Sequence, residues 1–259
     1  MRMYLTLFLL VYLTWACEEK TPQPSGETTN DVISGTYAPE AYVFDIPDFM
    51  PRPIVPTDNP MTVEGVELGR MLFHDPILSI DSTLSCQSCH RQELAFTDGN
   101  ALSTGVRGLE GIRNSMSLVN LAFNPRGFFW DGRVKSLEEQ AIIPIEDHLE
   151  MADDWDNVEA KLRRHPEYPQ LFRAAFGIEK KSELTRDLAV KAIAQFERTL
   201  ISADSRYDKV IWGRNGFPTD SEQRGIALFF IEDNQSVEHP GCSHCHFNPL
   251  FTDNNFRNN

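Results

Sequence analysis

Two short runs combine cysteine thiols with a histidine imidazole at fixed spacing. They are Cys86-Gln87-Ser88-Cys89-His90 and Cys242-Ser243-His244-Cys245-His246, and they use four of the five cysteines of the 259-residue chain. Such a run is typical of c-type haem attachment, in which both thiols bond to the macrocycle and the histidine binds iron. A redox pair, a zinc site or a disulfide leaves the adjacent histidine unexplained twice. The sequence therefore predicts two covalent haem c groups, with His90 and His246 as iron ligands.

The N-terminus has the proportions of a secretory signal peptide. Arg2 precedes an apolar stretch over residues 3–16, which as a helix of about 21 Å is too short for a bilayer core of about 30 Å. Cys17 follows directly and resembles the lipidated cysteine of a bacterial lipoprotein, with plain cleavage nearby as the alternative. We expect residues 1–17 to be a signal and the protein to be exported, either periplasmic or lipid-anchored in the bacterial envelope.

The charge balance narrows the choice of partners. The chain has 24 basic and 38 acidic residues, a formal net charge of −14. An acidic surface argues against nucleic acid and anionic lipid, so we expect membrane contact only through the lipid anchor. It favours a basic partner such as a small cytochrome, although simple solubility explains the charge equally well.

The elements that position the two motifs follow a polar, proline-rich start. Residues 18–45 are rich in Pro, Ser, Thr, Gly and Glu, which predicts a flexible tether. Residues 46–60 contain five prolines, which predicts an extended run along the surface of the body.

Helix signals dominate the remainder, and no run alternates as a strand does. We expect a mainly α fold of two cytochrome c-like haem domains, residues 46–202 and an incomplete second domain at 203–259. The signals are caps at Thr62, Ser136 and Thr219, a helix from Asp154 to Arg164, a helix from Tyr168 to Phe176 ended by Gly177, and one apolar face from Leu184 to Leu200.

Several further runs occur in a characteristic order and spacing. From about Ile46 onward the sequence resembles the bacterial di-haem cytochrome c peroxidase family, which includes related tryptophan-modifying oxidases. The matching runs are Leu68 to Phe73, Asp75-Pro76, Ser85 to His90, Gly111, Arg113-Asn114, Phe129 to Arg133, Glu139 to Ala141, Pro144 and Glu150-Met151.

The resemblance implies roles for particular residues. In that family the first haem reacts with peroxide and the second passes electrons to it. Glu150 matches the distal acid that moves a proton, Gln140 a distal hydrogen-bonding position, and Trp130 the tryptophan between the haems. Asn114 matches a ligand of an inter-domain calcium ion. The plainer alternatives are an exposed helix-end charge for Glu150, an ordinary polar residue for Gln140 and core packing for Trp130.

One departure concerns the loop before Arg113-Asn114. Many family members carry a histidine there that blocks the peroxide-reacting iron, whereas this chain has Val106. We hypothesise that the first haem is five-coordinate or water-bound when oxidised and needs no reductive activation. Other histidines could substitute as ligands, although surface or packing roles are commoner: His74, His148, His165, His239 and His244.

A second departure is the end of the sequence. Only 13 residues follow His246, and the family's second axial ligand, a methionine or tyrosine, lies further on. We therefore expect the second haem domain to be truncated.

The resemblance implies an activity and its partners. We expect a peroxidase that reduces hydrogen peroxide to water with electrons from a small c-type cytochrome or a cupredoxin, with a homodimer as a further expectation. One alternative is an oxidase that modifies a partner protein, which the missing loop histidine favours. Another is a non-enzymatic two-haem electron carrier.

Overall fold

The computed structural model describes residues 31–213, 215–231 and 241–255, and these form helices joined by long loops. Within these ranges the only β pairing is a set of isolated bridges, so the predicted mainly α class is confirmed. None of the described helices is long and apolar enough to cross a membrane. The predicted signal peptide with Cys17, residues 18–30 of the tether and His239 lie outside the described residues.

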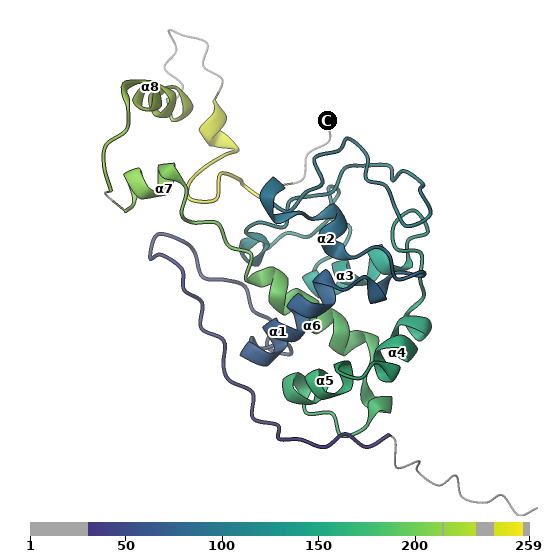
Figure 1. Cartoon of the computed structure of the whole chain (residues 1–259). Coiled ribbons are helices and arrows are strands. Elements are labelled where there is room, and N and C mark those ends of the chain that lie inside the picture. The colour runs from purple at the N-terminus through teal and green to yellow at the C-terminus, as the bar shows by residue number, and fades with distance from the viewer. Residues whose placement is uncertain (1–30, 214, 232–240, 256–259) are drawn as a thin grey trace, which may run out of the picture. The chain divides into compact units, whose positions relative to one another are not determined.

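The central helix pair is α1 (Val63–His74) packed against α6 (Arg186–Arg198) (Figure 1). The two backbones approach closely at Gly69, where a Cβ atom would overlap the carbonyl oxygen of Ala192. Three more helices surround the pair: α3 (Leu137–Glu146), which packs on α6, α5 (Tyr168–Phe176), which packs on α1, and α4 (Trp155–Arg164), which packs on α5.

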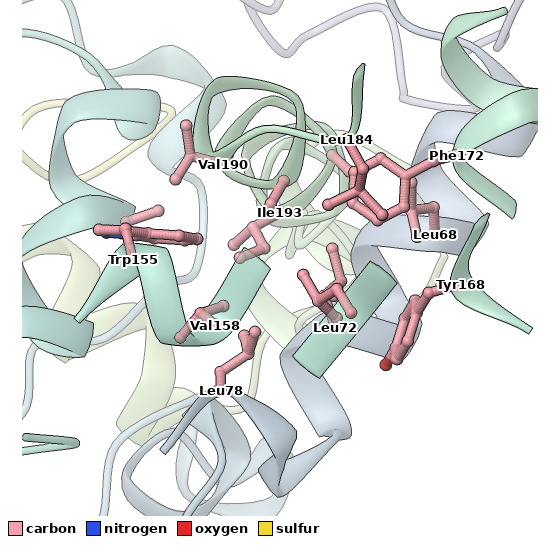
Figure 2. Close-up of a cluster of buried hydrophobic side chains, with 14 of the residues drawn as sticks. Leu68, Leu72, Leu78, Trp155, Val158, Tyr168, Phe172, Leu184, Val190 and Ile193 are labelled. Atoms are coloured by element: carbon pink, nitrogen blue, oxygen red, sulfur yellow. The ribbon is translucent and has the colours of Figure 1, made fainter. Parts of the chain in front are cut away.

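The main core joins side chains from these helices (Figure 2). Trp155 and Val158 of α4 and Tyr168 and Phe172 of α5 meet the apolar faces of α1 and α6. The completely buried aliphatic members include Leu68, Leu72, Leu78, Val158, Leu162 and Leu184. Burial of each such side chain contributes about 1.5–3 kcal/mol, so this core fixes the frame that carries the haem motifs.

The predicted helix caps are present. The hydroxyl of Thr62 accepts the N–H of Gly65 at 3.0 Å, and that of Ser136 accepts the N–H of Glu139 at 3.1 Å. Asp154 caps α4, and Gly177 ends α5 at φ +75°. Thr219 caps α8 (Asp220–Phe229), and its own N–H donates to the Glu222 carboxylate. The Glu139 carboxylate accepts the N–H of Lys135, the residue before the Ser136 cap.

The apolar face predicted from Leu184 to Leu200 is longer than the helix. Leu184 lies before α6 in an extended conformation, because the guanidinium of Arg163 donates two hydrogen bonds to its carbonyl. Leu200 lies beyond the last turn of α6. Both side chains still join the hydrophobic clusters, so the apolar spacing was right and the helix bounds were too wide.

The described part of the predicted tether is packed against the body. Ile33 is buried, and its N–H donates to the carbonyl of Glu179 at 2.8 Å. The guanidinium of Arg173 donates to the carbonyl of Gly35. Residues 31–45 therefore form an extended strap along the body. The burial of Ile33 and the hydrogen bonds of the backbone hold it there.

Short elements complete the described chain. They are α2 (Cys86–Cys89), α7 (Arg206–Ile211) and the 3₁₀ turns η1 (Pro76–Leu78), η2 (Gln92–Leu94), η3 (Leu121–Phe123), η4 (Lys181–Glu183) and η5 (Cys242–His244).

Candidate active site

The first cysteine pair lies on the single helical turn α2. Ser85 precedes this turn, and its N–H donates to the hydroxyl of Ser88 at 3.1 Å. The three-residue spacing brings Cys86 and Cys89 to one side of the turn. Neither is in a disulfide, and burial raises the pKa of the thiols to about 12 and about 11.

These thiols do not resemble a redox or zinc site. Redox cysteines have a lowered pKa in electropositive surroundings, the opposite of what burial produces at Cys86. Among the described residues no group of three or more His, Cys, Asp or Glu side chains is placed to hold a metal ion. The donor set fits thioether attachment of a haem.

His90 is oriented by a backbone carbonyl. Its Nδ1 lies 2.8 Å from the carbonyl oxygen of Phe96, so Nδ1 carries the proton and leaves the lone pair of Nε2 free. Burial lowers the pKa of His90, and this hydrogen bond opposes only part of that effect. A neutral imidazole held in one orientation fits an axial ligand of haem iron.

The second motif repeats this local geometry. Nδ1 of His246 lies 2.8 Å from the carbonyl oxygen of Phe251, and both phenylalanines are left-handed, at φ +59° for Phe96 and +55° for Phe251. Two residues after each phenylalanine an aspartate carboxylate accepts a backbone hydrogen bond. Asp98 accepts the N–H of Asn100, and Asp253 accepts the N–H of Asn255.

Sequence reasoning missed these acceptors. The available signal was the repeated Phe-Thr-Asp, at residues 96–98 and 251–253, which follows each Cys-x-x-Cys-His run. The repeat orients both histidines alike, so the two motifs share more than their cysteines.

A cavity of about 420 Å³ adjoins the first motif. Its volume falls within the range of small-molecule and cofactor sites. Leu118, Leu121 and Phe128 contribute apolar wall. The structure brings together every residue predicted for the first site except Cys86: Cys89, His90, Asn114, Trp130, Gln140 and Glu150 all line this cavity.

Glu150 is a half-buried residue in the turn that follows α3. Its N–H donates to the carbonyl of Asp147 at 2.9 Å, and the next residue, Met151, donates to the carbonyl of Pro144 at 3.0 Å. Burial raises the pKa of Glu150, the nearby Asp147 raises it further, and Arg133 opposes both. This differs from the exposed helix-end charge that was the alternative.

Gln140 reaches the same cavity from α3. It lies one turn before Pro144, which also lines the cavity, so the two share a helix face. Pro144 has no N–H for the carbonyl of Gln140, which interrupts the helical hydrogen bonds beside the cavity.

Trp130 and Asn114 are joined by a hydrogen bond. The indole Nε1 of Trp130 donates to the backbone carbonyl of Asn114 at 3.1 Å. Trp130 is 51% exposed, so core packing does not explain it. No described cluster of acidic ligands supports calcium at Asn114, and that assignment stays a prediction.

A charged group on the cavity wall was not predicted to be part of the site. Asp131 accepts hydrogen bonds from Arg113 and Arg133, each at 3.1 Å, and the guanidinium of Arg133 lies 3.5 Å above the centre of the Phe129 ring. Asp131 balances one of the two guanidinium charges, so this group of three keeps one positive charge that could pair with a ligand carboxylate, while Asp147 and Glu150 line the cavity elsewhere.

The alternative histidine ligands lie elsewhere. Of the histidines that the structure describes, His90 alone lines the cavity. His74 bonds to Gln87, His148 is largely exposed beside Asp147, and His165 packs on Tyr168.

A smaller apolar cavity of about 310 Å³ lies near the second motif. Helices α7 and α8 supply most of its walls, and Phe251, the acceptor of the His246 hydrogen bond, completes them. Arg206 of α7 and Glu222 of α8 form a two-point ion pair that ties the two helices together.

The helical body and its histidine-bearing cysteine motifs define the class of proteins that carry haem c. Residues 63–216 match the family model described as "Di-haem cytochrome c peroxidase". The chain belongs to this di-haem cytochrome c peroxidase family.

Individual relatives agree with that assignment. Methylamine utilization protein MauG of Methylorubrum extorquens is 37% identical over 82% of this chain and 57% of its own length. Cytochrome c551 peroxidase of Nitrosomonas europaea is 36% identical over 74% and 54%, respectively. A crystal structure of a MauG-like protein associated with microbial copper homeostasis superposes with a TM-score of 0.73, at 34% identity over 84% of this chain and 62% of that one. The chain thus spans a little over half the length of these curated relatives.

Proposed function

We propose that the protein is a cytochrome c peroxidase that reduces hydrogen peroxide to water at the His90 site. The observation that carries this proposal is the half-buried carboxyl of Glu150, which lines the same cavity as Cys89 and His90. Haem, attached through Cys86 and Cys89 and bound by His90, would supply an iron that binds peroxide and accepts its oxidising equivalents.

The chain's own residues would handle the proton. Ionised Glu150 would accept a proton from one peroxide oxygen and return it to the other, which would leave as water. Gln140 hydrogen-bonds the bound oxygens and fixes their orientation. Arg113 and Arg133 supply positive charge for the carboxylates of the haem.

Electrons would reach this site from the second motif. Cys242, Cys245 and His246 would hold the second haem, and Trp130 would shorten the path between the two. The donor would be a small basic c-type cytochrome or a cupredoxin, attracted by the acidic chain. We further propose that the protein acts outside the cytoplasm, held to the bacterial envelope through Cys17.

The decisive experiment replaces Glu150 by Gln in the full chain. Peroxide turnover with a reduced small cytochrome c should fall by about 10²–10⁴, while haem content stays at the parent level. The matched control is Glu146→Gln, an exposed position at the end of α3 that should keep parent turnover. Unchanged turnover in Glu150→Gln would remove the catalytic role of this residue.

A second candidate is an oxidase that modifies a partner protein by the same peroxide chemistry. Val106, in place of the loop histidine, favours it, since such an iron would be open without prior reduction. Peroxide consumption that needs a protein partner and no cytochrome donor would support this activity over the peroxidase.

A further inference from the structure

The loop that carries Val106 is a compact hairpin. Thr104 and Glu110 form an antiparallel bridge, the N–H of Gly105 donates to the carbonyl of Leu109 at 2.9 Å, and that of Gly111 donates to Ser103 at 2.8 Å. The segment 103–111 therefore holds its own shape, with the N–H groups of Gly105, Gly108 and Gly111 paired inside it.

This hairpin packs directly on the backbone of the Glu150 turn. The N–H of Val106 donates to the carbonyl of Glu150 at 2.8 Å. At Gly105 there is no room for a side chain, because a Cβ atom would overlap the carbonyl of Leu149 and lie 2.7 Å from that of Glu150. These contacts join segments more than forty residues apart in the sequence.

Glycine is required at position 105 because of its close contact with the Glu150 turn, and not because of its backbone conformation. Its φ lies outside the left-handed range, so an alanine could adopt the same backbone. Gly108 in the same hairpin is the reverse case, with φ +72° and open space around the position of a Cβ atom.

We propose that the hairpin 103–111 is a positioning element for Glu150, and that Gly105 is the residue on which this positioning depends. The turn is also held by the carbonyls of Asp147 and Pro144, which accept the N–H groups of Glu150 and Met151, so the hairpin adds a contact from a distant segment. Displacing it would move the Glu150 carboxyl and admit water to it. The functional consequence rests on the proposed catalytic role of Glu150.

The test compares Gly105→Ala with Gly108→Ala in the haem-loaded full chain. The first readout is the pKa of Glu150, from an infrared titration of the carboxyl in which the Glu150→Gln spectrum is subtracted. Asp147 and Arg133 are the charged neighbours that also act on this group, and neither is altered. Gly105→Ala should lower the pKa toward its ordinary value, because the carboxyl becomes more exposed. Gly108→Ala strains the backbone of the hairpin tip but adds no contact with the Glu150 turn, so it should lower the pKa less.

The second readout is the peroxide rate, which should fall at least tenfold in Gly105→Ala only, with haem content retained. An unchanged Glu150 pKa in Gly105→Ala, or an equal shift in Gly108→Ala, would overturn the proposal. If Glu150→Gln itself keeps parent turnover, the proposed function fails, but a pKa shift in Gly105→Ala still establishes the positioning. Should Gly105→Ala not fold, hydrogen exchange of the parent decides: the Val106 amide should be protected, and fast exchange would refute the contact.

Discussion

The guanidinium of Arg198 and the carboxylate of Glu138 form a two-point contact between α6 and α3, with Nη1 to Oε1 at 2.9 Å and Nη2 to Oε2 at 3.1 Å. The Arg198 side chain is 4% exposed and that of Glu138 is 16% exposed. Asn59 also donates to Glu138, at 2.6 Å. This contact holds α3, and with it Gln140, in place relative to the central helix pair.

Replacing Glu138 by Gln should lower the free energy of unfolding by about 2–4 kcal/mol, because Arg198 keeps a buried charge without its partner. Burial alone would raise the pKa of Glu138, but the hydrogen bonds from Arg198 and Asn59 outweigh it and the pKa is lowered. Its contribution is therefore full above about pH 4.5 and is lost as the pH falls below that value. Urea unfolding at pH 7 and pH 3 measures both effects, and the exposed Glu67→Gln on α1 is the control. An equal loss at both pH values would contradict the ion-pair explanation.

Glu197 on α6 should make stability fall with rising pH. It is 4% exposed, and no donor among the described residues reaches its Oε2. Burial raises its pKa to about 8, with a smaller rise from Glu138 and opposition from Arg198. The folded protein thus keeps a proton that the unfolded chain releases above about pH 4.5. The stabilising contribution is full below that pH and is lost progressively until about pH 8.

Glu197→Gln should remove this loss. The variant should gain stability over the parent between pH 5 and pH 8, by an amount on the order of a few kcal/mol. Urea unfolding at three pH values in this window checks the prediction. A constant difference across the window would mean that Glu197 does not titrate in it.

Gly69→Ala should destabilise the central helix pair. The added methyl group overlaps the backbone carbonyl of Ala192 and lies 3.0 Å from Cβ of Phe196, so α1 and α6 must separate. We expect a loss of about 2–3 kcal/mol in thermal or urea unfolding. The control is Gly225→Ala in α8, where a Cβ atom meets nothing within 4 Å and helix propensity improves. Equal losses in both variants would argue against close packing as the cause.

Each cysteine pair should hold one covalent haem independently of the other pair. Mass spectrometry of the parent should find two haems per chain, and Cys86→Ala/Cys89→Ala and Cys242→Ala/Cys245→Ala should each retain one. The duplicated histidine geometry is the reason to expect the second site to load independently. A parent with a single haem would contradict that expectation.

The oxidised protein should contain a high-spin haem, since Val106 cannot bind iron. An EPR spectrum checks this directly. Val106→His should convert that signal to low-spin and slow the peroxide reaction until the protein is reduced. A parent whose spectrum is entirely low-spin would refute the hypothesis of an open first iron.

The features that could be predicted from the sequence are those that depend on contacts between residues close together in the chain. The Thr62 and Ser136 caps, and the stop at Gly177, each rest on contacts within a few residues, and all three are confirmed. The start of α6 was misjudged because Leu184 is held by Arg163, twenty-one residues away. The apposition of Gly105 and Leu149 could not be predicted, because it depends on how two loops meet after folding.

The candidate site likewise contains features that the sequence predicted and features that it did not. Haem attachment followed from spacing, and the convergence of Gln140, Trp130 and Glu150 on one cavity followed from the family resemblance. Their positions are described, and their roles stay predictions. The orientation of His90 by Phe96 was missed, although the repeated Phe-Thr-Asp was available in the sequence.

A mechanical force applied to the chain from its N-terminal side would reach the body through the strap formed by residues 31–45. Its first attachment points are Ile33 to Glu179 and Gly35 to Arg173, beside the end of α5, and further along it is bonded to residues 61–64 through Glu40 and Tyr42. A pull on the chain from its N-terminal side would therefore be borne first by these contacts, at a distance along the chain from residues 86–90. The cavity would keep its geometry under such a pull for as long as the strap stays attached.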